Sequence, residues 1–288
     1  FNQGSWYKEL VEGIAFYQFL CAILKDYDTR KTEIIYKLQT IGQKIFRKAY
    51  LMADMTVDHE GMQICTKPLV SFAGKLYTAP MSAVDCAVKT IGTCPRHNEA
   101  FITSGMVQYN ACAGNFEGSG MAYSGSMNVL KNVLGNEYLW NNVRVKGGAY
   151  GCMCGFAPSG NGYFTSYRDP NLAKTYDIYA NAADYVRSLA LDDRELTKYI
   201  IGAVGAIDLP MTASMKGNRS LAAFLGERSF EQIQKNRDEL LATTVDDLRG
   251  LSKAVASVIE AGHICVVGSE SKITEEKDRF EYVAQLTQ

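Results

Sequence analysis

Residues 138–151 carry the side chains whose types and spacing best suit chemistry. The segment reads Tyr-Leu-Trp-Asn-Asn-Val-Arg-Val-Lys-Gly-Gly-Ala-Tyr-Gly, so Arg144 and Tyr150 lie on either side of the pair Gly147 and Gly148. Glycine allows backbone conformations that end a helix abruptly, so Arg144 in a last helical turn and Tyr150 on a following strand can face one cleft. Both side chains can donate hydrogen bonds. Such donors are needed to stabilise the negative charge that develops on a carbonyl oxygen during acyl transfer.

On spacing alone, a structural explanation of this segment is the more ordinary one. Arg144 would complement the negative end of the helix dipole, and Tyr150 would pack on a sheet. A structural explanation also suits residues 163–171, because Arg168 and Asp169 at a strand end would form an ion pair with each other.

The histidines do not form a zinc motif. His59, His97 and His263 lie far apart, and none has a second histidine four residues later. Neither H-E-x-x-H nor H-x-x-E-H occurs, although a zinc hydrolase needs two or three ligands that converge on one ion. We therefore predict structural roles for these histidines and no metal site in this chain.

Other catalytic signatures are also missing. No G-x-S-x-G elbow occurs, and the glycine-rich residues 114–125 lack the lysine of a phosphate-binding loop, which favours a flexible strand-to-helix connection. Cys152-x-Cys154 suggests a metal or redox pair, but no second ligand pair follows it. The 8 scattered cysteines favour free thiols in a reducing compartment, a bacterial cytoplasm in preference to a mitochondrial matrix.

Composition excludes two classes of partner. The 288 residues contain 30 basic and 31 acidic side chains, and the net charge of -1 provides no long-range attraction for nucleic acid or an anionic membrane. The longest apolar run, residues 14–24, is too short to span a bilayer and reads as a buried helix. We predict a globular protein with neither nucleic-acid nor membrane partners.

The elements around the candidate residues follow from periodicity and turn signals. Residues 100–113 are rich in β-formers, and residues 119–143 are mostly helical. Residues 149–156 and 163–167 then form a hairpin around a turn-forming sequence. Helices follow, one after the capping box Asp192-x-x-Glu195 and one from Ser229. This order predicts an α+β fold, with an antiparallel sheet and helices packed on one face.

The two ends of the chain share one order of elements. Residues 6–25 and 34–45 read as helices, residues 50–57 as a strand, and residues 58–60 as the start of another helix. Near the other end, Thr244-x-x-Asp247 caps a helix, and a strand at residues 263–267 follows. We therefore predict the end of one α+β module at 1–76, a linker at 77–97 with Pro80 and Pro95, and a complete second module at 98–288.

Residues 143–151 and 166–172 together resemble the presequence protease branch of the insulinase/pitrilysin-type zinc metallopeptidases. Residues 138–140, 202–210 and 228–244 also resemble the final domain of that branch. The resemblance implies a metallopeptidase half-barrel-like module at 98–288. It also implies a four-domain enzyme whose two halves enclose a chamber for unstructured peptides, and an N-terminal half that holds Zn2+ in an H-x-x-E-H motif.

The same resemblance implies roles for residues of this chain. Arg144 and Tyr150 would be catalytic, and both would bind substrate together with Gly147 and Gly148. Zinc-bound water would attack a peptide carbonyl while Tyr150 donates to the oxyanion and Arg144 holds the substrate. Without the N-terminal half, this chain should not hydrolyse peptides.

Two alternatives remain at this stage. A non-catalytic peptide-binding or assembly subunit could share the fold, although the presence of both Arg144 and Tyr150 argues against it. An unrelated enzyme that uses Cys152 and Cys154 would need metal or redox activity in the chain itself. The start of the sequence inside a predicted helix favours a piece of a larger enzyme over a natural subunit.

Overall fold

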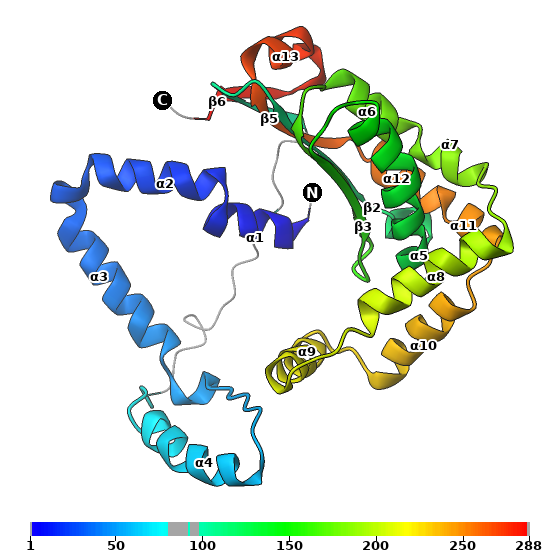
Figure 1. Cartoon of the computed structure of the whole chain (residues 1–288). Coiled ribbons are helices and arrows are strands. Elements are labelled where there is room, and N and C mark those ends of the chain that lie inside the picture. Colours follow the sequence, from blue (N-terminus) through cyan, green and yellow to red (C-terminus); the bar gives the residue numbers. More distant parts are fainter. Residues whose placement is uncertain (1, 80–91, 93–97, 287–288) are drawn as a thin grey trace. The chain divides into compact units, whose positions relative to one another are not determined.

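A computed structural model describes residues 2–79, 92 and 98–286 (Figure 1). The chain divides into two compact units. Unit 1 comprises Thr93–Leu209 and Phe230–Gln288, and unit 2 comprises Asn2–Gly92 and Pro210–Ser229. The predicted linker at 77–97 lies largely outside the described residues, and the predicted boundary near residue 97 stays a prediction.

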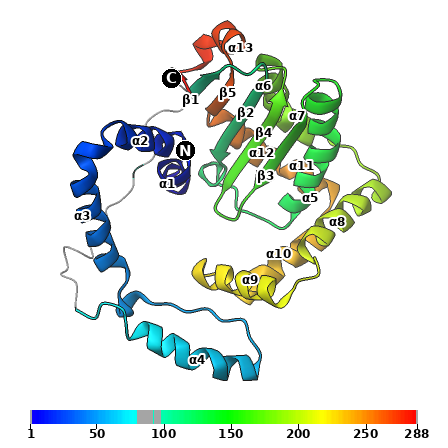
Figure 2. The same cartoon turned by 60° about the vertical axis from the view of Figure 1, so that its left-hand side comes forward.

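Unit 1 is built on a six-stranded sheet in the order β3-β4-β2-β5-β1-β6 (Figure 2). Its strands are β1 (Asn98–Thr103), β2 (Gln108–Asn115), β3 (Gly151–Phe156), β4 (Asn161–Asp169), β5 (His263–Ser269) and β6 (Tyr282–Gln285). β3, β4, β2 and β5 pair antiparallel, as predicted, whereas β1 pairs parallel with β5 and with β6. The predicted α+β class is confirmed. The sheet is mixed and not wholly antiparallel, because the long connections from β1 to β5 and β6 allow parallel pairing.

Helices cover one face of this sheet (Figures 1 and 2). Those in contact with β2, β3 or β4 are α5 (Ser126–Val133), η3 (Leu134–Val145), α6 (Ala173–Ala180) and α12 (Ser252–Glu260). Further helices complete the unit: α7 (Ala182–Arg187), α8 (Asp193–Ile207), α10 (Phe230–Leu241), α11 (Val245–Gly250) and α13 (Glu270–Glu275), with short turns η2 (Glu117–Ser119) and η4 (Lys277–Arg279). The core between sheet and helices includes Phe116, Leu130, Phe164, Tyr179, Val258 and Val266.

Alternation along β4 separates the two faces of the sheet. Phe164 and Ser166 are buried beneath the helices, whereas Tyr163 and Tyr167 point to the opposite face. Successive side chains of a strand point to opposite faces, so this pattern is typical of a sheet covered on one side.

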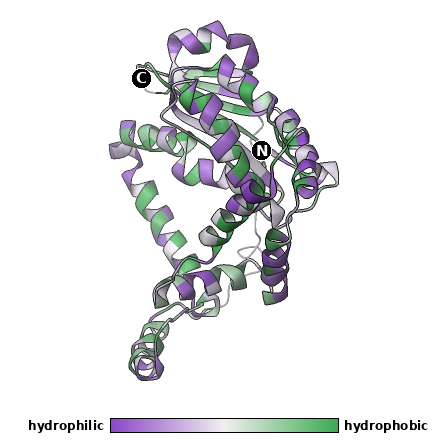
Figure 3. Cartoon of the chain, turned by 45° about the vertical axis from the view of Figure 1, so that its right-hand side comes forward, coloured by the Kyte–Doolittle hydropathy of each residue, from purple (hydrophilic) through white to green (hydrophobic). Residues whose placement is uncertain are grey.

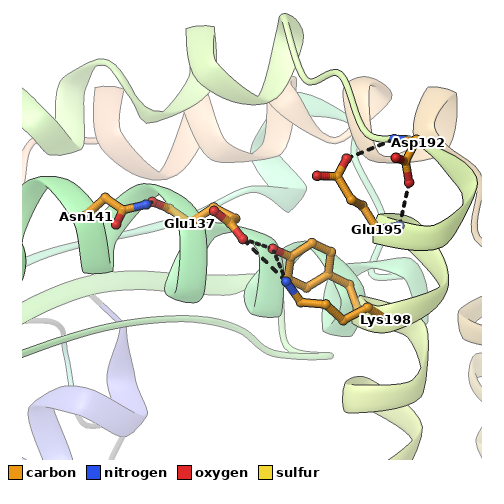
Figure 4. A network of polar contacts seen from close by, with 6 residues as sticks. Glu137, Asn141, Asp192, Glu195 and Lys198 are labelled. Atoms are coloured by element: carbon orange, nitrogen blue, oxygen red, sulfur yellow. Dashed lines mark hydrogen bonds and ion pairs between the residues drawn. The ribbon is translucent and has the colours of Figure 1, made fainter.

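The predicted helix starts and stops are largely confirmed in unit 1. Asp192 and Glu195 form a reciprocal capping box at α8, and Thr244 and Asp247 form another at α11. The predicted helix at residues 119–143 begins later, at Ser126, and continues through η3. Lys198 of α8 forms an ion pair with Glu137 of η3 (Figure 4). The Tyr199 hydroxyl of α8 donates a hydrogen bond to the same carboxylate, so both side chains join the two helices.

Unit 2 contains helices and no strand among its described residues. They are α1 (Gln3–Glu12), α2 (Ile14–Lys25), α3 (Tyr27–Ile45), η1 (Lys48–Tyr50), α4 (His59–Ala73) and α9 (Ala213–Leu225). None of the described residues of this unit is buried, and the side chain of Leu24 is 78% exposed. Hydrophobic and hydrophilic residues alternate along the helices of the chain (Figure 3).

Two predictions for this unit are wrong. The sequence predicts one helix at residues 6–25, but the extended backbone of Gly13 divides them into α1 and α2, and neither helix has a buried residue within the unit. The predicted strand at residues 50–57 is irregular, because the described residues offer no neighbouring strand for its backbone N–H and C=O groups. Among the described residues, no helix is both long and apolar enough to cross a membrane.

Candidate functional site

Arg144 lies in the last turn of η3, next to Trp140. This helix is wound more widely than an α-helix: the Lys146 N–H donates to the Asn141 carbonyl five residues earlier, at 3.0 Å. The Arg144 guanidinium carbon is 4.0 Å from the centroid of the Trp140 ring, four residues earlier on the same helix. Stacking on an aromatic face orients the guanidinium and leaves its N–H groups available as donors.

The glycine pair ends this helix abruptly, as predicted. The Gly148 N–H donates to the Arg144 carbonyl at 2.8 Å, and the Ala149 N–H donates to the Val143 carbonyl at 3.1 Å. Gly148 has φ +82°, a left-handed conformation that glycine adopts without steric cost. A Cβ on Gly147 would approach the Val143 carbonyl oxygen to 2.4 Å. The turn therefore requires glycine at both positions, for different reasons.

Tyr150 follows the turn and immediately precedes β3. Its backbone N–H donates to the Arg168 carbonyl at 3.3 Å. Its ring makes an edge contact with Tyr167 at 5.5 Å between centroids, and the Arg168 guanidinium carbon lies 5.7 Å from the ring centroid. The side chain nevertheless remains 59% exposed. Neighbours thus hold the ring while its surface stays accessible.

The polar groups of Arg144 and Tyr150 are uncommitted. Over the described residues, the structure records no ion pair or hydrogen bond for the Arg144 guanidinium and no hydrogen bond for the Tyr150 hydroxyl. Two hydrogen-bond donors are therefore available on either side of one rigid turn. That both face a single cleft, and that Gly147 and Gly148 contact substrate, stay predictions.

Arg168 and Asp169 do not pair, contrary to the sequence expectation. The Asp169 carboxylate is buried and accepts hydrogen bonds from the Ser166 hydroxyl at 2.6 Å and the Thr175 hydroxyl at 2.8 Å. Arg168 has φ +48°, and its side chain turns toward Tyr150. No local signal in the sequence marks this conformation, since it depends on pairing with a distant strand.

The two neighbouring cysteines on β3 are unsuited to redox chemistry at neutral pH. Burial raises the pKa of the Cys152 thiol to about 11, with the positive charge of Arg144 opposing this and the negative charge of Asp169 adding to it. Burial also raises the pKa of the Cys154 thiol to about 12. A thiol attacks as its thiolate, so the reading of Cys152 and Cys154 as a reactive pair is not supported.

The described residues do not fit a zinc site. They contain no group of three or more His, Cys, Asp or Glu side chains that could hold a metal ion. His59 begins α4, where its ring contacts the Gln63 amide, and His263 begins β5. His97 lies outside the described residues.

Comparison with known proteins identifies the family. Residues 98–272 match the family described as PreP C-terminal domain. Protein HypA of Clostridium perfringens is 33% identical over 99% of this chain, and Presequence protease 1 of Arabidopsis thaliana is 33% identical over 94%. The chain spans 29% and 25% of the lengths of these two relatives.

A solved structure supports the fold. The crystal structure of a protease from Helicobacter pylori matches 73% of this chain and 52% of its own chain, with a TM-score of 0.50 and 13% sequence identity. At that identity the likeness concerns the fold alone. Taken with the match over residues 98–272, these relatives show that the chain belongs to the presequence protease family and includes its PreP C-terminal domain.

Proposed function

We propose that this chain is the C-terminal portion of a zinc metalloendopeptidase that degrades unstructured peptides in an enclosed chamber. Its part in that enzyme is to bind the substrate and to stabilise the oxyanion. The observation that carries the proposal is the pair of uncommitted donors, Arg144 and Tyr150, on either side of a turn that its own backbone hydrogen bonds hold in place. Preorganised donors stabilise developing charge without the cost of reorganisation during the reaction.

The zinc ion of the complete enzyme belongs elsewhere in this proposal. Because the described residues offer no ligand group, we place the metal in the N-terminal half of the full-length protein, which also completes the chamber. The roles that follow concern only residues of this chain.

Tyr150 supplies a hydrogen bond that strengthens as the reaction proceeds. Its hydroxyl donates to the oxygen of the scissile carbonyl, and negative charge grows on that oxygen as the carbonyl carbon becomes tetrahedral. A hydrogen bond to a charged acceptor is shorter and about twice as strong as one to a neutral acceptor. The difference lowers the barrier, so we assign to Tyr150 an effect on kcat.

Arg144 supplies binding that is present before and during the reaction. Its guanidinium carries five N–H donors in a fixed plane, which suits the carbonyl oxygens of an extended peptide. The Trp140 ring at 4.0 Å keeps that plane oriented. Such binding acts equally on substrate and transition state, so we assign to Arg144 an effect on KM.

Replacing Arg144 in the full-length enzyme tests this assignment. We expect Arg144→Met to raise KM for an unstructured peptide by roughly 10- to 100-fold, the loss expected for hydrogen bonds from a charged group. Lys146→Met, two residues further on, removes the same charge from an exposed position and should leave KM unchanged. Equal KM values in the two variants would contradict a substrate-binding role for Arg144.

The alternative of a non-catalytic subunit on the same fold makes a different prediction. Such a subunit could bind peptides through Arg144, but a donor at Tyr150 would have no oxyanion to stabilise. A Tyr150 side chain that is exposed, and whose hydroxyl has no hydrogen-bond partner among the described residues, therefore favours the peptidase.

A further inference from the structure

The last residue of β4, Asp169, lies at the centre of a buried polar cluster. Its Oδ2 atom accepts from the Ser166 hydroxyl at 2.6 Å, the Thr175 hydroxyl at 2.8 Å and the Asn110 amide at 3.2 Å. Its Oδ1 atom accepts from the Asn171 backbone N–H at 2.9 Å. Within the described part of the chain no lysine or arginine forms an ion pair with it. A buried carboxylate is costly unless it is fully hydrogen-bonded, so this cluster specifies one position for Asp169.

A β-bulge turns Asp169 into that cluster. Gln108 of β2 pairs with Asp169 whereas Asn110 pairs with Ser166, so two residues of β4 oppose one residue of β2. One of the two is Arg168, at φ +48°, in a region that side chains other than glycine rarely adopt. Without the extra residue, alternation would point the Asp169 side chain to the face of the sheet opposite Ser166.

The cluster is joined directly to the turn that carries the candidate site. The Asn171 side-chain amide donates to the Gly147 carbonyl at 2.6 Å and contacts Asp169 Oδ1 at 3.5 Å. The carbonyl of Arg168, in the bulge itself, accepts the Tyr150 N–H at 3.3 Å. Both ends of the turn between Gly147 and Tyr150 are therefore tied to the segment that Asp169 fixes.

We propose that Asp169 and Asn171 are positioning residues, which hold the glycine turn so that Arg144 and Tyr150 point at the substrate. This inference rests on the proposed function. Asp169 holds the bulge and the backbone of Asn171 in place. The Asn171 side-chain amide then holds Gly147 through its hydrogen bond to the Gly147 carbonyl. Neither residue needs to touch the substrate, because both act through the turn.

Asn171→Ala in the full-length enzyme is the direct test. It removes the hydrogen bond to the Gly147 carbonyl and leaves the Asp169 cluster otherwise intact. We expect kcat to fall on the order of 10- to 100-fold, because a catalytic side chain misplaced by about 1 Å can lose that much activity. Asn161→Ala is the matched control. The Asn161 side-chain amide donates to the Ser159 hydroxyl at 3.1 Å, in the turn at the opposite end of β4. That variant should leave kcat unchanged.

A double-mutant cycle separates positioning from general stability. If Asn171 acts through Tyr150, then Asn171→Ala should cause no further fall in kcat in a Tyr150→Phe background. The same proportional loss in both backgrounds, or no loss in the single variant, would overturn the positioning role. If Tyr150→Phe alone has no effect, the proposed function fails instead, so the two failures can be told apart.

Amide hydrogen exchange of the 288-residue chain gives a readout that does not depend on activity. We expect Asn171→Ala to speed exchange at Gly148, Ala149 and Tyr150, whose N–H groups hold the turn, while the amides of β4 near Asn161 keep their rates. Unchanged exchange at the turn would also contradict the inference. Asp169→Asn, which places an amide opposite the donors Ser166 and Thr175, should show the same local effect more strongly.

Discussion

Gly147 and Gly148 serve the candidate site in different ways, one through space and one through conformation. We expect Gly148→Ala to lower the free energy of unfolding by about 1 to 2 kcal/mol, because φ +82° brings a Cβ close to the following carbonyl. Gly135, in the preceding helix η3, has open space around its missing Cβ, and Gly135→Ala should raise stability by roughly 0.5 to 1 kcal/mol. Urea unfolding of the 288-residue chain measures both free energies. A Gly148→Ala variant as stable as the unchanged chain would contradict the account of the turn.

The buried thiols give a second prediction at this scale. With pKa values of about 11 and about 12, Cys152 and Cys154 stay protonated at pH 8, where roughly one thiol in a thousand or fewer is ionised. Iodoacetamide at pH 8 should therefore label the exposed Cys21 first, and labelling of Cys152 should rise only as the pH approaches 11. Mass spectrometry of the labelled chain checks this, and equally fast labelling of Cys21 and Cys154 would contradict it.

At the scale of elements, what could be predicted from the sequence depended on local signals. The capping boxes at Asp192 and Thr244 and the glycine turn after Arg144 are set by residues within a few positions of one another, and each was predicted correctly. The parallel pairing of Asn98 with Ile264 and the bulge at Arg168 arise from contacts between distant segments. A single sequence gives no local signal for such pairing, which is why the sequence predicts the wrong partner for Asp169.

The start of α8 offers a test of the local signals. Asp192 accepts the Glu195 N–H at 2.8 Å, and the Glu195 carboxylate accepts the Asp192 N–H at 3.0 Å (Figure 4). Asp192→Ala should lower the free energy of unfolding by about 1 kcal/mol, as the loss of a helix cap typically does. Asp193→Ala changes the neighbouring acidic residue in the same first turn and should cost less, about 0.3 kcal/mol. Equal losses in thermal or urea unfolding would show that the cap is not what stabilises the helix start.

At the scale of the whole molecule, the two units differ in how much they bury. Unit 1 holds every buried residue of the described chain, whereas unit 2 has none, despite exposed apolar side chains such as Leu24 and Phe19. Helices that bury no side chain open easily, so we expect the amides of α2 and α3 to exchange much faster than those of β2 and β4 in the 288-residue chain. Hydrogen exchange followed by mass spectrometry measures this, and equal protection of both units would contradict the difference in packing.

The family match covers residues 98–272, and the proposed role of the unit built on them depends on one hydroxyl group. Tyr150→Phe in the full-length enzyme removes only that hydroxyl, so kcat for an unstructured peptide should fall by roughly 100-fold or more while zinc content is unchanged. Tyr163→Phe removes the hydroxyl of another exposed tyrosine on the same sheet and should keep normal turnover. Normal turnover in Tyr150→Phe, or an equal loss in both variants, would contradict the assignment of Tyr150 to the oxyanion.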